Sequence, residues 1–519
     1  MKKVLFTILV FLLGMSVAFY FVKKQRTTSN SYDKLRDLIY YIDLYYVDSV
    51  NHQQLSEDVI LGILEKLDPH STYSNAEDNK TQTEQLEGTF EGIGIQFNIM
   101  NDTIMVVAAL AGGPSERTGI KAGDRIIFVD KEKVAATGVT TEQVLKKLRG
   151  KKGTLVTIGI LRPEHNEIFE FEIVRDIIPT NSVPSAYMIN KHTGYIKIDQ
   201  FGGQTADEFS EALISLLNNG MHKLVLDLRG NSGGYLDAAL KITDQFLQKN
   251  DIILSVKGLH SKSEKFQATG KGIFQNGELI VLIDEFSASS SEIVAGAIQD
   301  NDRGKIIGRR SFGKGLVQRP FDFPDGSQVR LTVSRYYTPS GRCIQRDYHN
   351  GTSAYYDDLI KRLIGDQDTL SVKKNPISVV EYKTKLGRTV YGGGGITPDI
   401  IVPYEKLIHS NAYYKALNNS AFIQFAFNYA NQNKATLTHN YPSAASFIKK
   451  MKVSETILYS YLKFYAQKSS REIPTLNSGE KEELSTWLKA LIGRNLYQDA
   501  GFYPVINTMD EVIGVALNH

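Results

Sequence analysis

Cysteine and tryptophan are nearly absent from this chain of 519 residues, which contains one of each. The single cysteine, Cys343, excludes an internal disulfide and any zinc finger built on cysteine ligands. No G-x-S-x-G elbow and no H-E-x-x-H motif occurs, and none of the ten histidines belongs to a recognisable triad or metal motif. The sequence therefore indicates no metal site and no cofactor, and it lacks the usual serine-histidine signature.

A strong excess of charge of one sign is also missing. The formal net charge is +3, and residues 1–30 contribute five basic residues without an acid, so the rest of the chain carries 3 − 5 = −2. A nearly neutral body lacks the basic footprint of a nucleic-acid-binding protein. The hydrophobic content of 42% is that of ordinary globular proteins, and the length predicts about three domains.

The N-terminus holds a long apolar run. It extends from Val4 to Val22 between two lysine pairs, which is just long enough to cross a bilayer. We expect residues 1–26 to be a signal-anchor in the cytoplasmic membrane, because the apolar character continues to a basic stop. The triplet Ser16-Val17-Ala18 leaves a cleaved secretory signal as the alternative. Both interpretations place the body in the cell envelope, outside the cytoplasm.

Hydrophobic spacing divides the rest of the chain into four regions. Residues 31–87 show helical periodicity, and residues 88–178 show short β-like runs separated by glycine. Residues 179–403 alternate apolar strands with helical stretches, which predicts an α/β layer structure. Residues 404–519 are helical by period. We therefore expect an α/β core with an inserted β-rich domain, preceded by helices and followed by a helical extension.

The β-rich region resembles a PDZ domain. The motif G-I-G-I at residues 92–95 leads into a strand, and GGPSERTGIKAGDRII follows at residues 112–127. A turn and a bulge in a small barrel would account for the first motif alone, but not for the second. The resemblance implies that a peptide's terminal carboxylate binds the loop N–H groups and that the peptide adds as a strand beside residues 93–97. The expected contact residues are Gly92, Ile93, Gly94, Ile95 and, on the opposite helix, Val144 and Leu148.

Three motifs in the α/β region could carry chemistry. The glycine turn LDLRGNSGG at residues 226–234 frees backbone N–H groups for an anion or an oxyanion. A serine cluster at residues 287–291 precedes a helix, where Ser289 and Glu292 match a capping box, and where a serine oxygen would also lie near unpaired N–H groups. Residues 308–314 begin like a phosphate-binding loop, but a glycine follows where Ser or Thr should hold magnesium, so nucleotide binding is disfavoured.

A serine nucleophile without a histidine needs another base. A lysine can serve when burial disfavours its charged form and leaves free amine near neutral pH. Lys314, held between two glycines, is the candidate, and the alternative is a solvated loop lysine. His70 is interpreted as part of a turn.

The combination of motifs resembles the carboxyl-terminal processing peptidases, also called tail-specific proteases, over residues 35–403. The motifs are LDPHSTY, LDLRGNSGG, SASSSEIVAGAIQD, GRRSFGKGLVQ, YYTPSGRCIQ and YGGGGITPDI. The resemblance implies a PDZ-containing serine endopeptidase with a crotonase/ClpP-like layered core and a Ser-Lys dyad. It assigns Ser289 as the nucleophile, Lys314 as the general base and Gln318 as the residue that orients the lysine.

The same resemblance implies a backbone oxyanion hole from Gly233 and Ser290, and a supporting, structural carboxylate at Asp300. Two positions depart from the family pattern, because Ser232 replaces a common proline and Ser290 a common alanine. Four serines of the cluster are therefore chemically similar, and the choice of Ser289 rests on family register.

The expected activity is acyl-enzyme cleavage of exported proteins that are captured by their C-terminal tails. The alternative is a catalytically inactive, membrane-tethered PDZ scaffold that binds protein C-termini. For residues 404–519 the sequence leaves open a homo-oligomer contact, an adapter-protein contact or packing alone.

Overall fold

The structure is a computed structural model that describes the chain except residues 1–30, 111, 163–164, 166, 365–379 and 405–408. It consists of two compact units, residues 1–67 and residues 68–519. The predicted signal-anchor at residues 1–26 lies outside the described residues. Among the described helices, none is long and apolar enough to cross a membrane.

Over its described residues, 31–67, the first unit contains the helices α2 (Ser31–Tyr45) and α3 (His52–Leu64). They fall in the stretch where apolar residues have helical spacing. The side chain of Asn51 accepts a hydrogen bond of 3.2 Å from the Gln54 N–H and so caps the start of α3.

The second unit begins with a short strand and a helix that lead into a small β-domain. In that domain β3 is the edge strand of a sheet ordered β3-β4-β5-β7-β8, and β6 pairs with β5. The helix α6 begins at a capping box formed by Thr140 and Gln143. The bounds are β1 Thr72–Ser74, α4 Ala76–Glu87, β2 Thr89–Gly92, β3 Ile95–Ile99, β4 Ile104–Ala109, α5 Pro114–Thr118, β5 Arg125–Val129, β6 Glu132–Lys133, α6 Thr141–Leu148, β7 Leu155–Leu161, β8 Ile168–Val174 and β9 Asp176–Pro179.

A six-stranded sheet ordered β10-β11-β12-β15-β16-β21 forms the base of the α/β core. All neighbouring strands from β11 to β21 are parallel. Five of the six residues of β15 are buried, as expected for a central parallel strand covered on both faces. The bounds are β10 Ser185–Met188, β11 Thr193–Lys197, β12 Lys223–Asp227, β15 Glu278–Ile283, β16 Lys305–Gly308 and β21 Ile400–Ile401.

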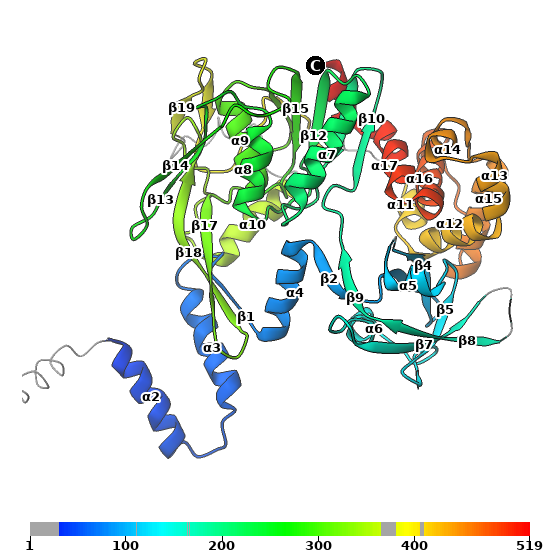
Figure 1. Cartoon of the computed structure of the whole chain (residues 1–519), viewed down its shortest axis with the longest axis horizontal. Helices are drawn as coiled ribbons and strands as arrows, with labels where there is room; N and C mark the ends of the chain where they lie inside the picture. Colours follow the sequence, from blue (N-terminus) through cyan, green and yellow to red (C-terminus); the bar gives the residue numbers. More distant parts are fainter. Residues whose placement is uncertain (1–30, 111, 163–164, 166, 365–379, 405–408) are drawn as a thin grey trace, which may run out of the picture. The chain divides into compact units, whose positions relative to one another are not determined.

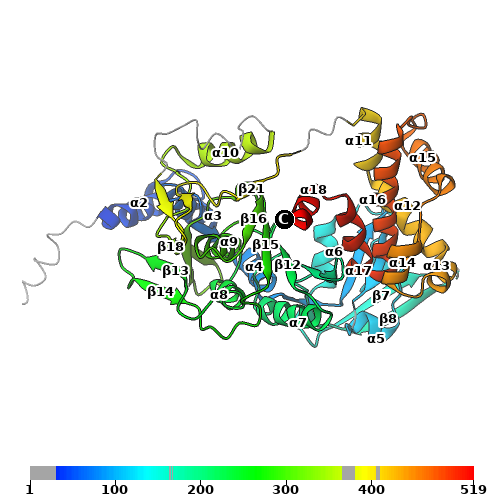
Figure 2. The same ribbon diagram turned by 90° about the horizontal axis from the view of Figure 1, so that it is seen from above.

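Helices cover both faces of this sheet. On one face α7 (Thr205–Asn218), α8 (Leu236–Asp244) and α9 (Ser290–Asp300) pack into a large apolar cluster with the strands (Figure 1). On the other face α18 (Glu511–Asn518) buries Val512 and Ile513 against strand residues, and Figure 2 shows α9 and α18 on opposite sides of β15 and β16. The last helix of the chain is therefore part of the core.

A second sheet brings the turn before β1 close to β17. It has the order β1-β18-β13-β14, and β17 also pairs with β18. The residue opposite Arg330 of β18 is Thr72 in β1 and Pro320 in β17. The bounds are β13 Ile252–Lys257, β14 Glu264–Gln267, β17 Leu316–Asp322 and β18 Gln328–Tyr337, followed by α10 Thr352–Ile364 and the hairpin β19 Glu381–Lys383 with β20 Thr389–Tyr391.

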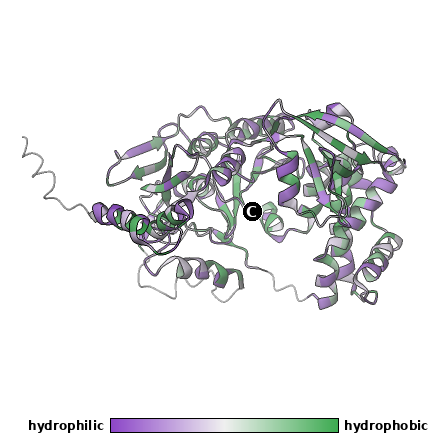
Figure 3. Cartoon of the chain, turned by 90° about the horizontal axis from the view of Figure 1, so that it is seen from below, coloured by the Kyte–Doolittle hydropathy of each residue, from purple (hydrophilic) through white to green (hydrophobic). Residues whose placement is uncertain are grey.

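The C-terminal extension is helical, as its periodicity predicts. Figure 3 shows hydrophilic and hydrophobic residues alternating around its helices, as in amphipathic helices that share an apolar face. These helices bury a core of their own. The bounds are α11 Asn411–Leu417, α12 Ser420–Gln432, α13 Lys434–Asn440, α14 Ala444–Lys450, α15 Glu455–Ser469, α16 Ser478–Tyr497 and α17 Asp499–Ile506.

Candidate active site

Ser289 lies in the sharp turn between β15 and α9. Its backbone has φ of 53° and ψ of −110°, a region that a residue with a side chain rarely adopts. Such strain persists only where the surrounding structure enforces it, and it is concentrated at functional sites. The local fold therefore marks Ser289 within the serine cluster.

Hydrogen bonding separates Ser289 from its neighbours. The hydroxyl of Ser287 donates to the Leu228 carbonyl at 2.8 Å, that of Ser290 to Gly234 at 3.0 Å and that of Ser291 to Asn231 at 2.9 Å. All three serines are buried, whereas Ser289 is partly exposed. Three hydroxyls thus hold the turn against the glycine loop, and Ser289 is the candidate nucleophile among these four serines.

The glycine turn lies directly against Ser289. A Cβ atom at Gly233, where φ is 105°, would lie 2.8 Å from the Cβ atom of Ser289 and 3.1 Å from the Ser290 nitrogen, so only glycine fits here. The predicted oxyanion donors, the N–H groups of Gly233 and Ser290, are therefore neighbours. In this conformation the Gly233 N–H donates to Asn231 Oδ1 at 2.8 Å, and an oxyanion would have to replace that acceptor.

Lys314 is partly buried and held by Gln318. Its Nζ donates to Gln318 Oε1 at 2.8 Å. Burial, together with the nearby charge of Arg330, lowers the pKa of the Lys314 amine to about 8, whereas Glu292 and Asp68 oppose the decrease. A sizeable fraction of this amine is therefore neutral in mildly alkaline solution, as a general base requires. Within the described residues no hydrogen bond joins the side chains of Lys314 and Ser289.

A turn far away in the sequence positions Gln318. Its Nε2 donates to the carbonyl oxygen of His70. The Asp68 carboxylate folds this turn, because it accepts hydrogen bonds from the N–H groups of His70 and Ser71 and from the Ser71 hydroxyl. Burial lowers the pKa of His70 to about 4, and the Lys314 charge adds to the decrease, so the imidazole is neutral near pH 7.

The sequence located this turn but not its role. His70 belongs to a turn, as interpreted, yet its side chain is buried and contacts the Tyr355 hydroxyl at 2.9 Å. An Asp side chain often accepts hydrogen bonds from the backbone N–H groups two and three residues later. Asp68 at this position is therefore a turn signal that the sequence shows. Its proximity to Lys314 depends on the pairing of β1 and β17 with the same strand, which the sequence does not show.

Asp300 lies at the opposite end of α9 from Ser289, about 16 Å along an eleven-residue helix. Its carboxylate pairs with Arg342 at 2.7 Å, and both side chains are fully buried. The N–H and hydroxyl of Ser340 donate to the second carboxylate oxygen. These contacts are those of a structural ion pair that holds the loop after β18.

Two backbone N–H groups of the segment that resembles a phosphate-binding loop already donate hydrogen bonds to a side chain of the protein. The N–H groups of Gly313 and Lys314 donate to the buried Glu292 carboxylate at 2.7 Å and 2.9 Å. A phosphate would need these donors. The structure thus agrees with the sequence in disfavouring nucleotide binding here.

The predicted loop of the β-domain lies between β2 and β3. Gly94 has φ of 72°, and an added Cβ atom would touch Ile178 at 3.0 Å; Gly92 ends β2 and Ile95 begins β3, with Ile93 between them. The side chains of Val144 and Leu148 are 0% and 4% exposed and belong to the domain core. As an i, i+4 pair they form the inner stripe of α6, and their contact with a peptide stays a prediction.

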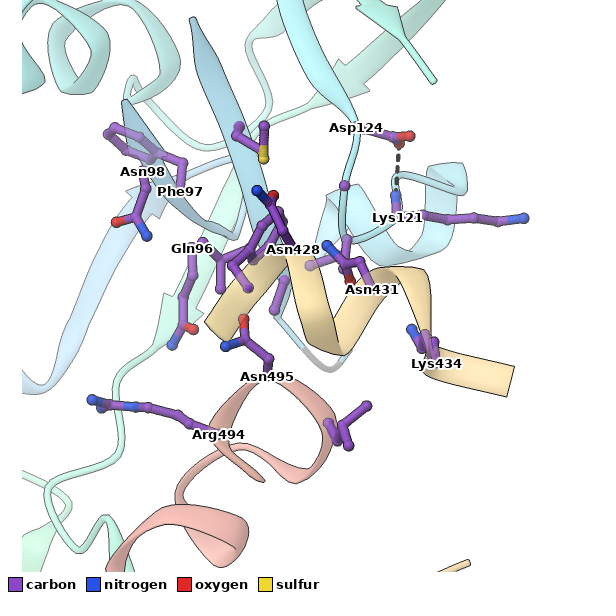
Figure 4. Close-up of a pocket in the computed structure, with 18 of the residues that line it drawn as sticks. Gln96, Phe97, Asn98, Lys121, Asp124, Asn428, Asn431, Lys434, Arg494 and Asn495 are labelled. Atoms are coloured by element: carbon purple, nitrogen blue, oxygen red, sulfur yellow. Dashed lines mark hydrogen bonds between the residues drawn. The ribbon is translucent and has the colours of Figure 1, made fainter. Parts of the chain in front are cut away.

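The exposed apolar residue of α6 is Leu145. The edge strand β3 also borders a cleft of about 1320 Å³ that the helices of the extension line from the other side. Figure 4 shows Gln96 of β3, Asn428 of α12 and Asn495 of α16 at this cleft. Within the described residues β3 pairs with β4 alone, so its free edge can accept another strand.

Comparisons with known proteins identify the parts of the chain. The model of peptidase family S41 matches residues 192–352, a PDZ domain model matches residues 92–173, and a family of unknown function matches residues 412–498. The carboxy-terminal-processing protease of Bartonella bacilliformis is 36% identical over 329 residues, which are 62% of this chain and 75% of the relative. The chain belongs to the carboxy-terminal processing proteases.

Other members of this family show similar agreement. The carboxy-terminal processing protease CtpA of Bacillus subtilis is 34% identical over 62% of this chain and 69% of its own length. A solved structure of the photosystem II D1 C-terminal processing protease is 26% identical, covers 61% of this chain and 84% of its own, and has a TM-score of 0.36. The family models and the curated relatives confirm the predicted family, the fold class and the serine-type peptidase activity of this processing protease.

Proposed function

We propose that this processing protease cleaves exported proteins with Ser289 as nucleophile and Lys314 as general base, after its PDZ domain has captured their C-terminal tails. The observation that carries the proposal is the environment of Lys314. Its amine is partly buried, it is held by Gln318, and its pKa is lowered to about 8, which is the state that a lysine needs to accept a proton from a serine.

The first half of the reaction forms an acyl-enzyme. Neutral Lys314 takes the proton of the Ser289 hydroxyl while the serine oxygen attacks the scissile carbonyl carbon. The N–H of Ser290, in the first turn of α9, donates to the developing oxyanion. The Gly233 N–H donates as well once it leaves Asn231 Oδ1. Each such donor contributes about 3 kcal/mol to transition-state stabilisation.

The second half releases the products. Lys314 gives its proton to the nitrogen of the leaving chain, and the peptide bond breaks. Lys314 then takes a proton from a water molecule that attacks the ester carbon, and it returns this proton to the Ser289 oxygen as the ester bond breaks, which regenerates the hydroxyl. Because Lys314 Nζ donates to Gln318 in the described conformation, substrate binding must bring Nζ to the serine hydroxyl. Catalytic hydrogen bonds commonly tighten in this way only in the substrate complex.

Substrate capture is assigned to the PDZ domain. The free edge of β3 supplies backbone hydrogen bonds to an extended tail, and the loop at residues 92–95 supplies N–H groups to the terminal carboxylate. With residues 1–26 as an anchor or an export signal, the protease would act in the cell envelope on exported chains.

A gel assay tests the proposed chemistry. Wild type and Ser289→Ala are incubated with an unfolded protein that carries a free C-terminus, and shortened products are expected only with wild type. Ser290→Ala is a matched control, because it removes a neighbouring hydroxyl but keeps the Ser290 N–H. Products of equal amount from Ser289→Ala would contradict the proposal. Folded wild type that binds tails and never cuts them would favour the inactive scaffold.

A further inference from the structure

One buried carboxylate joins the backbone of the proposed nucleophile to the backbone of the proposed base. Glu292, in the first turn of α9, is 0% exposed. Its Oε2 accepts from the N–H of Ser289 and the N–H of Lys314, both at 2.9 Å. Ser289 lies three positions before Glu292 in the sequence, and Lys314 lies 22 positions after it. A single oxygen therefore connects two separate segments.

The second carboxylate oxygen of Glu292 holds the loop that carries Lys314. Oε1 accepts from the Ser311 hydroxyl at 2.6 Å and from the Gly313 N–H at 2.7 Å. A carboxylate has about four lone-pair sites, and four donors occupy them. A capping box would need only the bond from Ser289. Three of the four contacts therefore serve the base and not the helix.

A tyrosine hydroxyl makes a second connection between the same two residues. Tyr336 of β18 is 1% exposed, and its hydroxyl lies 2.8 Å from the Lys314 carbonyl oxygen and 3.2 Å from that of Ser289. Burial raises the pKa of this hydroxyl well above its usual value, so it remains a donor. Glu292 thus holds the two N–H groups and Tyr336 the two carbonyl groups.

We infer that Glu292 and Tyr336 are positioning residues of the dyad: they fix the separation of residues 289 and 314 through both peptide groups of each. The inference rests on the proposed function, because it concerns the geometry of that dyad. Since misplacement by about 1 Å can cost about 100-fold in rate, loss of either connection should lower kcat more than it changes KM.

Glu292 also acts on Lys314 through its charge. The charged and titratable groups that face Lys314 are Glu292 on α9, Asp68 and His70 in the turn before β1, and Arg330 on β18. Glu292 and Asp68 raise the pKa of Lys314, whereas Arg330 lowers it. Removal of the Glu292 charge therefore lowers the pKa of Lys314 further. The acid limb of the pH profile of kcat should then move to lower pH, which a purely structural role would not cause.

The test compares Glu292→Gln and Tyr336→Phe with wild type in kcat, KM and pH profile. We expect a decrease in kcat of about 100-fold for Glu292→Gln, because its amide would point N–H groups at donors, and of about tenfold for Tyr336→Phe. Of these variants, only Glu292→Gln should move the acid limb of the kcat profile to lower pH. Glu292→Asp keeps the negative charge, so its acid limb should lie at the same pH as in wild type. Glu208→Gln is the matched control, since that carboxylate accepts from the N–H groups of Ser182 and Val183.

Wild-type kcat in Glu292→Gln, or a decrease with an unmoved acid limb, would overturn the inference. If circular dichroism shows that Glu292→Gln is unfolded, Tyr336→Phe decides, and an unchanged kcat in that variant overturns the inference. Failure of the proposed function would look different, because wild type itself would then produce no Ser289-dependent cleavage. The two failures are therefore separable in one set of assays.

Discussion

The two ends of α9 each carry a buried acidic residue, and the two carboxylates are stabilised in different ways. At the N-terminal end Glu292 accepts four hydrogen bonds from uncharged donors. At the C-terminal end Asp300 pairs with the buried Arg342. An ion pair largely cancels its own field, whereas the charge of a carboxylate held by neutral donors acts on nearby groups. Burial raises the pKa of Glu292, and its four hydrogen bonds oppose this increase. One end therefore affects Lys314, and the other stabilises the fold.

The largest effect on kcat is expected from removal of the Lys314 amine, which lies near the N-terminal end of α9. Lys314→Ala should lower kcat by about 1000-fold or more, because it removes the proposed general base, while the protein remains folded. Cleavage of an unfolded protein followed on gels, with circular dichroism for folding, measures both. Full activity in a folded Lys314→Ala protein would refute the assignment.

At the C-terminal end of α9, substitution of Asp300 should lower the free energy of unfolding. Asp300→Ala leaves Arg342 buried without its partner, which costs about 3–5 kcal/mol, and it should leave the pH profile of the remaining active enzyme unmoved. Urea unfolding measures the loss, and the double variant Asp300→Ala/Arg342→Met should recover part of it. A shifted pH profile without a loss of stability would remove the contrast between the two ends.

The wild-type pH profile tests the state of Lys314 directly. Since burial lowers its pKa to about 8, and since the neutral amine is the reactive form, kcat should rise with pH and level off above about 8. Below that value the decrease should approach tenfold per pH unit. A profile that is flat from pH 6 to 9 would contradict the role of Lys314.

A shift of the acid limb of opposite sign to that of Glu292→Gln is expected at Arg330. The charge of this residue lowers the pKa of Lys314, so Arg330→Gln should move the acid limb to higher pH. Arg335→Gln is the matched control on the same strand, because Arg335 contacts Tyr348. If the acid limb of the pH profile lies at the same pH in both variants, the Arg330 charge does not affect the pKa of the Lys314 amine.

The smallest effect concerns neighbours on α6. Leu145 is exposed and Val144 is fully buried, so Leu145→Asp should weaken binding of a labelled peptide with a free C-terminus about tenfold, equal to about 1.4 kcal/mol. Its melting temperature should stay unchanged. Val144→Asp should instead unfold the domain. Fluorescence anisotropy, with an amidated peptide as control, measures binding, and unaltered affinity in Leu145→Asp would exclude this face of α6.

Local patterns revealed much of this site, and the rest depends on distant pairing. The sequence placed the glycine turn, the serine cluster and Lys314 as separate motifs, and the structure brings Gly233 against Ser289. The sequence could not distinguish the nucleophile among the four serines, because the distinction depends on which hydroxyls donate to carbonyl groups. It read Glu292 as a cap, because its bonds to Gly313 and Lys314 come from a segment about twenty residues further on.

The position of α18 sets an order of assembly. Val512, Ile513 and Ala516 close one face of the parallel sheet against Tyr195, Val225 and Ile280, and a parallel sheet needs both faces covered. Synthesis proceeds from the N-terminus, so the strands exist long before the segment that seals them. A chain stopped before residue 511 would present an open apolar sheet face. The protease therefore matures only after residues 511–518 have been synthesised.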